Sequence, residues 1–114
     1  MLNTTRRADF NEVIAYLKEN EGERFRASVA LPNGAGVRVR IPRYKIARQI
    51  DTVAGEHQLL LGHEDEREAD GQALNISSTG VHSLLWDKLS GCYIVDYKDG
   101  AHLTLTVHET KRRE

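Results

Sequence analysis

The feature that most constrains the fold of this chain is a pair of alternating runs on either side of a turn. The first run is Arg24 to Leu31 and the second is Val37 to Pro42, with Pro32 to Gly36 between them. Apolar and polar side chains that alternate in this way are typical of half-buried strands, and a cluster of Pro, Asn and Gly marks a turn. The sequence therefore predicts a β-hairpin over residues 24–42.

The two faces of this hairpin follow from the side-chain period of two, because a slip of one residue moves every side chain to the opposite face. A two-residue turn at Asn33 and Gly34 would set Val29 against Arg38 and mix the faces. A loop from Pro32 to Gly36 gathers the apolar side chains on one side instead. We therefore predict the longer loop, with these facing pairs: Leu31 and Val37, Val29 and Val39, Ala27 and Ile41.

The opposite side of the hairpin is rich in arginine. Residues 24–50 hold seven of the sixteen Lys and Arg residues and no Asp or Glu. Cations set close together on one sheet face repel each other unless salt or an anionic partner screens them. Two interpretations stay open: a docking surface for phosphate or carboxylate groups, or a solvated face whose arginine stems cover apolar surface beneath an acidic loop. The polar side chains expected on this side are Arg24, Arg26, Ser28, Arg38 and Arg40.

The C-terminal part of the chain predicts a second hairpin. Cys92 to Tyr97 and His102 to His108 are alternating runs about the loop of residues 98–100. A two-residue turn would mix the faces, whereas a three-residue loop with Gly100 in the left-handed conformation gathers nearly all apolar side chains on one side. The pairs expected from that loop are Tyr93 and Leu105, Val95 and Leu103, Tyr97 and Ala101.

A helix is expected near the N-terminus. Asp9 followed by Glu12 is a variant of the capping box, and apolar residues at the spacing of one helical face come directly after it. Asn20 and Gly22 are typical of the end of a helix. The apolar stripe expected to face the core is Phe10, Val13, Ile14 and Leu17.

Two later segments also favour helices. Residues 43–54 are ambiguous between helix and strand, and the spacing of Ile46, Ile50 and Val53 after a proline favours helix. A further helix is expected over Val81 to Leu89, with a glycine in the stop position. Short strands are expected at Gln58 to Gly62 and at Ala73 to Ile76.

These elements together predict an α+β fold. At 114 residues the chain fits a single domain over residues 1–114. We expect an antiparallel sheet of five or six strands built from hairpins, with two or three helices packed on one face. Residues 1–8 and 110–114 are expected to be frayed, and residues 63–72, which are rich in acids, to form a mobile loop that folds over the arginine side.

Charge and cysteine content narrow the classes of function. The formal net charge is −1, so no overall field draws the chain to nucleic acid or to a membrane, and attraction has to be local. A single cysteine excludes an internal disulfide, and no leader or run of eighteen apolar residues is present. We therefore predict a cytoplasmic protein without a membrane partner.

Residues for catalysis are sparse. The sequence has no nucleotide-binding glycine loop, nucleophile elbow, paired-cysteine metal motif or His-Glu-x-x-His helix. Cys92 is interpreted as a small buried hydrophobe, and an acid and base pair of Asp96 or Asp99 with His102 is ordinary for a turn. We predict neither a cofactor, nor a metal, nor enzymatic activity. A metal site without recognised ligand spacing would use His57, His63, Glu64 and Asp65.

The function expected from these observations is a non-enzymatic interaction module, such as an inhibitor, an immunity-type protein or an accessory protein. It would dock the arginine-rich hairpin on an acidic surface of a partner protein. The alternatives are direct DNA or RNA binding through the same face, and a small metal-dependent enzyme. A homodimer is a further option if the last hairpin leaves an edge strand open. The partner-binding residues expected are Arg24, Arg26, Arg38, Arg40, Arg43, Arg48 and, as an aromatic anchor, Tyr44.

Overall fold

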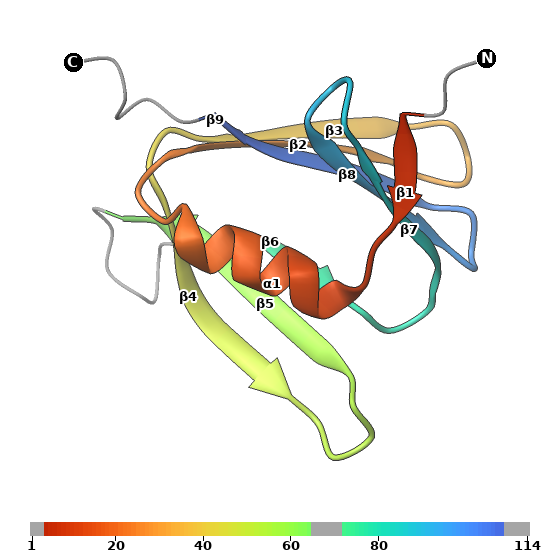
Figure 1. Ribbon diagram of the computed structural model, residues 1–114, viewed down its shortest axis with the longest axis horizontal. Coiled ribbons are helices and arrows are strands. Elements are labelled where there is room, and N and C mark those ends of the chain that lie inside the picture. Colours follow the sequence, from red (N-terminus) through yellow and green to blue (C-terminus); the bar gives the residue numbers. More distant parts are fainter. Residues whose placement is uncertain (1–3, 65–71, 109–114) are drawn as a thin grey trace.

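The computed structural model describes residues 4–64 and 72–108. The described part of the protein is mostly β, because strands hold more than half of its residues and the helix holds 10 of them. The described residues form nine strands in two antiparallel sheets, and one helix (Figure 1). The predicted α+β fold, with two or three helices on one face of a single sheet, is therefore wrong.

The larger sheet has six strands and the smaller sheet has three. In spatial order, the larger sheet consists of β1 (Thr5–Arg7), β7 (Val81–Asp87), β8 (Cys92–Tyr97), β9 (His102–His108), β2 (Arg24–Ala30) and β3 (Gly36–Ile41). The smaller sheet consists of β4 (Tyr44–Asp51), β5 (His57–His63) and β6 (Gln72–Ser77). The larger sheet thus joins β2, near the start of the chain, to β9, near its end.

The helix α1 (Phe10–Glu19) forms where the capping signal predicts it. The Asp9 side chain accepts a hydrogen bond from the Glu12 backbone N–H at 2.9 Å, which satisfies one donor of the first turn. At the other end, the Asn20 amide donates to the Tyr16 carbonyl at 2.8 Å. The side chains that α1 buries are Val13, Ile14 and Leu17, in agreement with the predicted stripe.

One hydrophobic cluster joins the helix to both sheets. Figure 1 shows the larger sheet above, the smaller sheet below and α1 along the opening between them. We call the side of the larger sheet that contributes to this cluster its inner face, and the other side its outer face. The fully or nearly fully buried residues of the cluster include Val13 and Leu17 of α1, Phe25 of β2, Ile41 of β3, Leu59 and Leu61 of β5, Val95 of β8 and Leu105 of β9.

The C-terminal hairpin pairs as predicted. Tyr93 lies opposite Leu105 and Val95 opposite Leu103. The Tyr97 N–H donates to the Ala101 carbonyl at 2.9 Å, which closes the three-residue loop. Gly100 has a φ of 95°, the left-handed conformation that the loop requires.

The first hairpin has the predicted faces in a different register. Val29 pairs with Val37 and Ala27 with Val39, so the strands are shifted by two residues from the expected pairs. Leu31 lies in the loop, where its N–H donates to the Ala35 carbonyl at 2.7 Å, and its side chain is 41% exposed. Because the shift is even, every side chain stays on the face that the sequence indicates.

Two segments that favour helices form strands, and both carry a β-bulge. In β4 the register shifts between Ile46 and Arg48, and in β7 it shifts between Val81 and Ser83. A bulge adds one residue to one strand, so inward-facing positions are separated by three residues at that point instead of two. In β7 the bulge sets Val81 and Leu84 three residues apart on the inward side, a spacing that resembles a helix.

In β4 the apolar spacing does not mark one face of the strand. Ile50 pairs with Gln58, next to the pair of Gln49 with the buried Leu59. Val53 is exposed after the strand ends. The helix predictions for residues 43–54 and 81–89 are therefore wrong.

The remaining sequence predictions concern short segments. Strands β5 and β6 form where short strands are expected. Residues 5–7, inside the segment expected to be frayed, pair with β7. Most of the expected acidic loop, at 65–71, and the end of the chain at 109–114 lie outside the described residues. The single described helix is too short and too polar to span a bilayer.

Candidate anion-binding face

Four arginines share the outer face of β2 and β3, and we call them the outer Arg face. The two strands pair so that Arg26 lies directly opposite Arg40, and Ser28 opposite Arg38. The outer Arg face follows from the alternation of each strand, since the residues between these positions point into the core. Its members, all of them exposed, are Arg24, Arg26, Arg38 and Arg40.

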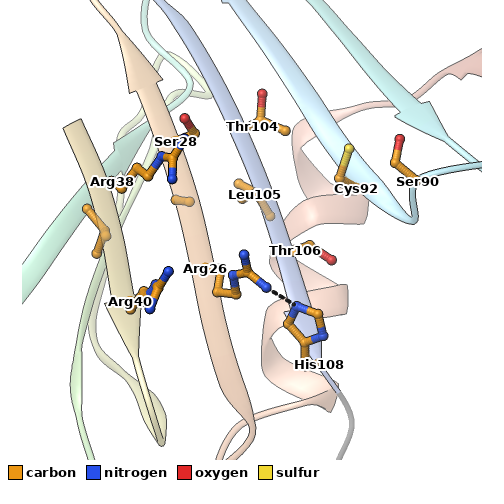
Figure 2. A pocket seen from close by; sticks show the side chains of 12 residues that line it. Arg26, Ser28, Arg38, Arg40, Ser90, Cys92, Thr104, Leu105, Thr106 and His108 are labelled. Atoms are coloured by element: carbon orange, nitrogen blue, oxygen red, sulfur yellow. Dashed lines mark hydrogen bonds between the residues drawn. The ribbon is translucent and has the colours of Figure 1, made fainter. Parts of the chain in front are cut away.

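Strand β9 extends this face with hydroxyl groups and a histidine. Thr106 pairs with Arg26, Thr104 with Ser28, and His108 with Arg24. Nη1 of Arg26 lies 3.2 Å from Nε2 of His108, as Figure 2 shows. A guanidinium can only donate hydrogen bonds, so Nε2 of His108 is the acceptor in this contact.

A groove of about 470 Å³ runs over the outer face between the hairpin and the turn that links β7 to β8. Arg26, Arg38 and Arg40 stand on one side of it, and Ser90 and Cys92 on the other (Figure 2). The Thr106 hydroxyl donates to the Gly91 carbonyl at 2.7 Å and so holds the turn against β9. Among the described residues that line the groove there is no Asp, Glu, Phe, Tyr or Trp.

The charge of the outer Arg face is not neutralised by the part of the chain that the structure describes. In residues 4–64 and 72–108, none of its four guanidiniums lies in an ion pair with a carboxylate. Elsewhere, Arg6 contacts Glu12 at 2.5 Å. Unpaired cations this close together attract anions, because a bound anion removes their mutual repulsion.

The structure separates the other three predicted residues from this face. Arg43 follows β3 and lies 3.9 Å from Glu64, the one residue of the acidic stretch 64–70 that the structure describes. Arg48 is exposed on β4, in the smaller sheet. Tyr44 is fully buried, so its ring does not extend the basic surface as expected.

Tyr44 has a structural position inside the core. Its hydroxyl donates to the Leu17 carbonyl at 2.6 Å, in the last turn of α1, where backbone carbonyls lack a helical partner. Burial raises the pKa of this phenol above its ordinary value. The ring also packs against Phe25, with the two ring centroids 5.7 Å apart. These contacts assign Tyr44 to holding the helix on the sheets.

The contribution of β9 is the part of this site that sequence reasoning missed. The alternation of Thr and His residues in β9 indicates a polar face but does not show which strand lies beside it. The pairing of β2 with β9 joins distant parts of the chain, and no local pattern indicates it. The same pairing corrects the expected open edge of the last hairpin, because β9 lies between β8 and β2 and β8 lies between β7 and β9.

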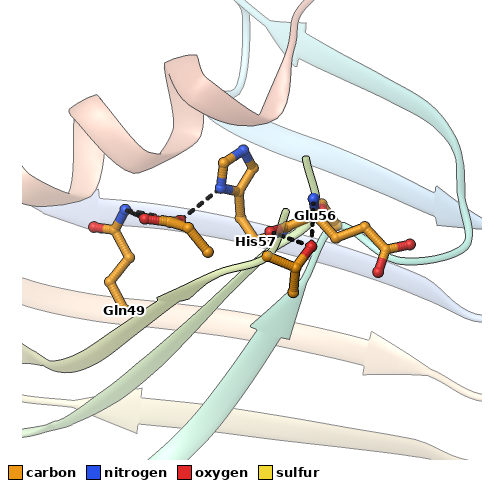
Figure 3. A network of polar contacts seen from close by, with 6 residues as sticks. Gln49, Glu56 and His57 are labelled. Atoms are coloured by element: carbon orange, nitrogen blue, oxygen red, sulfur yellow. Dashed lines mark hydrogen bonds and ion pairs between the residues drawn. The ribbon is translucent and has the colours of Figure 1, made fainter. Parts of the chain in front are cut away.

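The histidines considered for a metal site have other surroundings. Nδ1 of His57 lies 2.7 Å from Asp51, and the ring stacks on Phe10 with centroids 6.1 Å apart. Figure 3 shows this contact together with Gln49, whose amide also donates to Asp51. Hydrogen bonds from His57 and then Gln49 lower the pKa of Asp51. His63 is at the other end of β5, about 20 Å away for six residues of strand.

No cluster of metal-ligating side chains is found in the described residues, where no three His, Cys, Asp or Glu groups could hold an ion. One acid and base pair of the last hairpin does form, since the His102 ring contacts the Asp96 carboxylate. Both residues belong to the end of the hairpin near its loop, and neither lines the groove.

The chemistry that the outer face offers is the binding of an oxyanion. Guanidiniums and hydroxyls are hydrogen-bond donors to carboxylate, sulfate and phosphate oxygens. The groove is a polar concavity of a size typical of binding sites. Comparisons of the chain with protein-family models, with curated proteins and with solved structures gave no match.

Proposed function

We propose that this protein is an interaction module that binds an anionic surface of a partner protein through the outer Arg face. The observation that carries the proposal is the set of four exposed arginines on one sheet face, without a carboxylate partner in the described residues. The four arginines lie on two paired strands, and the backbone hydrogen bonds between these strands fix the spacing at which the side chains begin. The cationic surface therefore has a rigid base.

A protein partner is favoured over nucleic acid by two observations. The chain has a net charge of −1, so any DNA or RNA bound at this face meets repulsion from the rest of the molecule. The described lining of the groove has no Phe, Tyr or Trp, and the imidazole of His108 is its one aromatic ring on which a base could stack. An acidic patch on a folded protein can form ion pairs with these arginines and does not extend as a continuous polyanion past the rest of the molecule.

A binding role is favoured over catalysis. The described residues of the groove provide no carboxylate, and their histidine is hydrogen-bonded to Arg26. The Cys92 thiol is only 7% exposed. Among the described residues that line the groove, none forms a hydrogen bond with this thiol and could act as its base. A nucleophile with its general base, which most acyl and phosphoryl transfer needs, is not assembled here.

The test is capture of the partner from the native cell, after nuclease treatment, with two triple charge reversals. The first variant changes Arg26, Arg38 and Arg40 to Glu. The matched control changes Arg7, Lys18 and Arg48 to Glu, which alters the net charge equally at exposed positions of β1, α1 and β4. We expect one protein to be retained by the wild type and the control and lost by the first variant.

Two outcomes contradict this proposal. Retention of the same protein by both variants would show that the outer Arg face is a solvated surface. Nucleic-acid binding would be favoured instead if nuclease treatment removed all captured material. The binding constant for nucleic acid should then fall steeply with salt, and each Arg→Ala change should reduce the slope of that dependence.

A further inference from the structure

The groove beside the outer Arg face has the chemistry of a phosphate site. We propose that it binds a phosphoserine or phosphothreonine side chain of the partner protein. This inference rests on the proposed function and names the group that the face recognises. Three features support it: the spacing of the arginines, two hydroxyl groups without a side-chain hydrogen bond in the described residues, and the side chains that line the groove.

The backbone positions of three arginines in the groove form a compact triangle. Arg38 and Arg40 are two residues apart on β3, about 7 Å along the strand. Arg26 is directly opposite Arg40, so their Cβ atoms are about 5 Å apart. Long side chains at these positions reach a common anion. A phosphate monoester, with a charge of about −1.5 to −2 and three free oxygens, matches three guanidiniums better than a carboxylate with one charge and two oxygens.

Two hydroxyl groups lie ready beside this triangle. Ser28 and Thr104 are paired across β2 and β9, and both line the groove. Within the described residues neither hydroxyl makes a side-chain hydrogen bond, whereas Thr106 donates to Gly91 and Ser90 donates to Asp87. Ser28 and Thr104 are therefore free to donate to a phosphate oxygen that the guanidiniums leave unpaired.

The size and lining of the groove select the carrier of the phosphate. A volume of about 470 Å³ is larger than one phosphate group needs, so the groove also accommodates the side chain and neighbouring backbone of a peptide. A nucleotide carries a phosphate too, but its base requires a stacking surface, and the described lining has no Phe, Tyr or Trp. The open groove on a sheet face thus favours a phosphorylated protein segment.

One arginine of the triangle also contacts a histidine. His108 accepts a hydrogen bond from Arg26 through Nε2, beside the groove that both residues line. The guanidinium has further N–H groups for an anion, because it carries five in all. The contact with His108 therefore leaves Arg26 able to bind an anion as well.

The experiment is titration of the full chain, followed by ¹⁵N amide shifts and by calorimetry at one salt concentration. The probes are a short glycine-rich peptide with a central phosphoserine, and the same peptide with Glu or Ser in that place. We expect the phosphoserine peptide to bind about tenfold more tightly than the Glu peptide, a factor typical of added charge-assisted hydrogen bonds. Shifted amides should include those of Ser28, Arg38 and Thr104.

Variants locate the site. Arg38→Gln with Arg40→Gln should weaken the binding of the phosphoserine peptide by about tenfold or more, because two of the three guanidiniums are lost. Ser28→Ala should weaken it by about threefold, for one hydroxyl donor. Arg7→Gln is the matched control, exposed on β1 at the opposite edge of the sheet, and should leave binding unchanged. Far-UV circular dichroism checks that each variant is folded.

The outcomes separate this inference from the proposed function. Equal binding of the Glu and phosphoserine peptides overturns the inference, and so does binding of neither peptide by a chain that captures its partner through the outer Arg face. Tighter binding of AMP or of inorganic phosphate than of the phosphopeptide also overturns it. The proposed function fails in a different experiment, if the variant with Arg26, Arg38 and Arg40 changed to Glu still captures the partner.

Discussion

The two faces of β2 differ sharply in burial and in charge. On the inner face, Phe25 is fully buried and Ala27 nearly so, whereas Arg24 and Arg26 on the outer face are exposed. Side chains on one face contact their neighbours across the strands rather than the residues beside them in sequence. The residues that hold the fold and the residues proposed to bind a partner therefore alternate along the same strand, and each set can be changed separately.

The largest expected change in stability comes from a substitution on the inner face, at Phe25. Phe25→Ala should lower the free energy of unfolding by about 3 to 5 kcal/mol, because it leaves a cavity against Tyr44 in the core. The adjacent Arg26→Ala should change it by no more than about 0.5 kcal/mol. Urea unfolding of both variants measures the difference. Similar losses at the two positions would show that the two sets are not separate.

A smaller effect is expected at Tyr44, which the sequence assigns to binding and the structure to the core. Tyr44→Phe should destabilise the protein by about 1 to 2 kcal/mol, because the Leu17 carbonyl loses its buried donor. Capture of the partner should be unchanged. Loss of the partner by a variant with wild-type stability would restore Tyr44 as an aromatic anchor.

The next effect is a dependence of stability on pH at Glu12, which joins α1 to β1 and β8. Hydrogen bonds from Arg6 and from the Tyr93 hydroxyl lower the pKa of Glu12 in the folded state. Its stabilisation is therefore complete above the unfolded pKa of about 4.3 and is lost as pH falls through the lower folded pKa.

Glu12→Gln should consequently be less stable than the wild type at pH 7, by less than Tyr44→Phe because this site is partly exposed. The difference should disappear in acid, below the folded pKa of Glu12. Thermal unfolding across a pH series measures it. Glu19→Gln, exposed on the same helix, is the control and should follow the wild type at every pH.

The smallest effect should come from the outer face itself. Arg38→Gln with Arg40→Gln should leave the free energy of unfolding unchanged or raise it by up to about 0.5 kcal/mol at low salt, since it relieves repulsion between cations. Salt screens that repulsion, so any gain should vanish at 1 M NaCl. A clear loss of stability would show that these arginines hold the fold.

Alternation was enough to predict which side chains share a face. The C-terminal hairpin is confirmed in register because its turn residues, ending in Gly100, fix the loop length. The first hairpin is shifted by two residues because Val37 matches either Leu31 or Val29 on the apolar side, and alternation cannot distinguish shifts of two. The outer Arg face was therefore predicted correctly without the correct pairing.

The rest of the fold could not be predicted from local pattern. Strands β4 and β7 each contain a bulge, and one added residue interrupts the period of two that marks a strand in the sequence. The groove depends on the pairing of β2 with β9 and on the turn that Thr106 holds at Gly91. These contacts are set by packing between distant segments, and the residues concerned are ordinary polar residues in sequence.

The pairing of β2 with β9 also governs when the groove proposed as a binding site can form during synthesis. Arg24 lies opposite His108, so the two strands meet only after a large loss of chain entropy, and such long-range pairing is slow. A chain leaving the ribosome can form the β2–β3 hairpin early, while Thr104, Thr106 and His108 are still to be synthesised. The last strand that completes the larger sheet also completes the groove, so a nascent chain presents arginines before it presents a site.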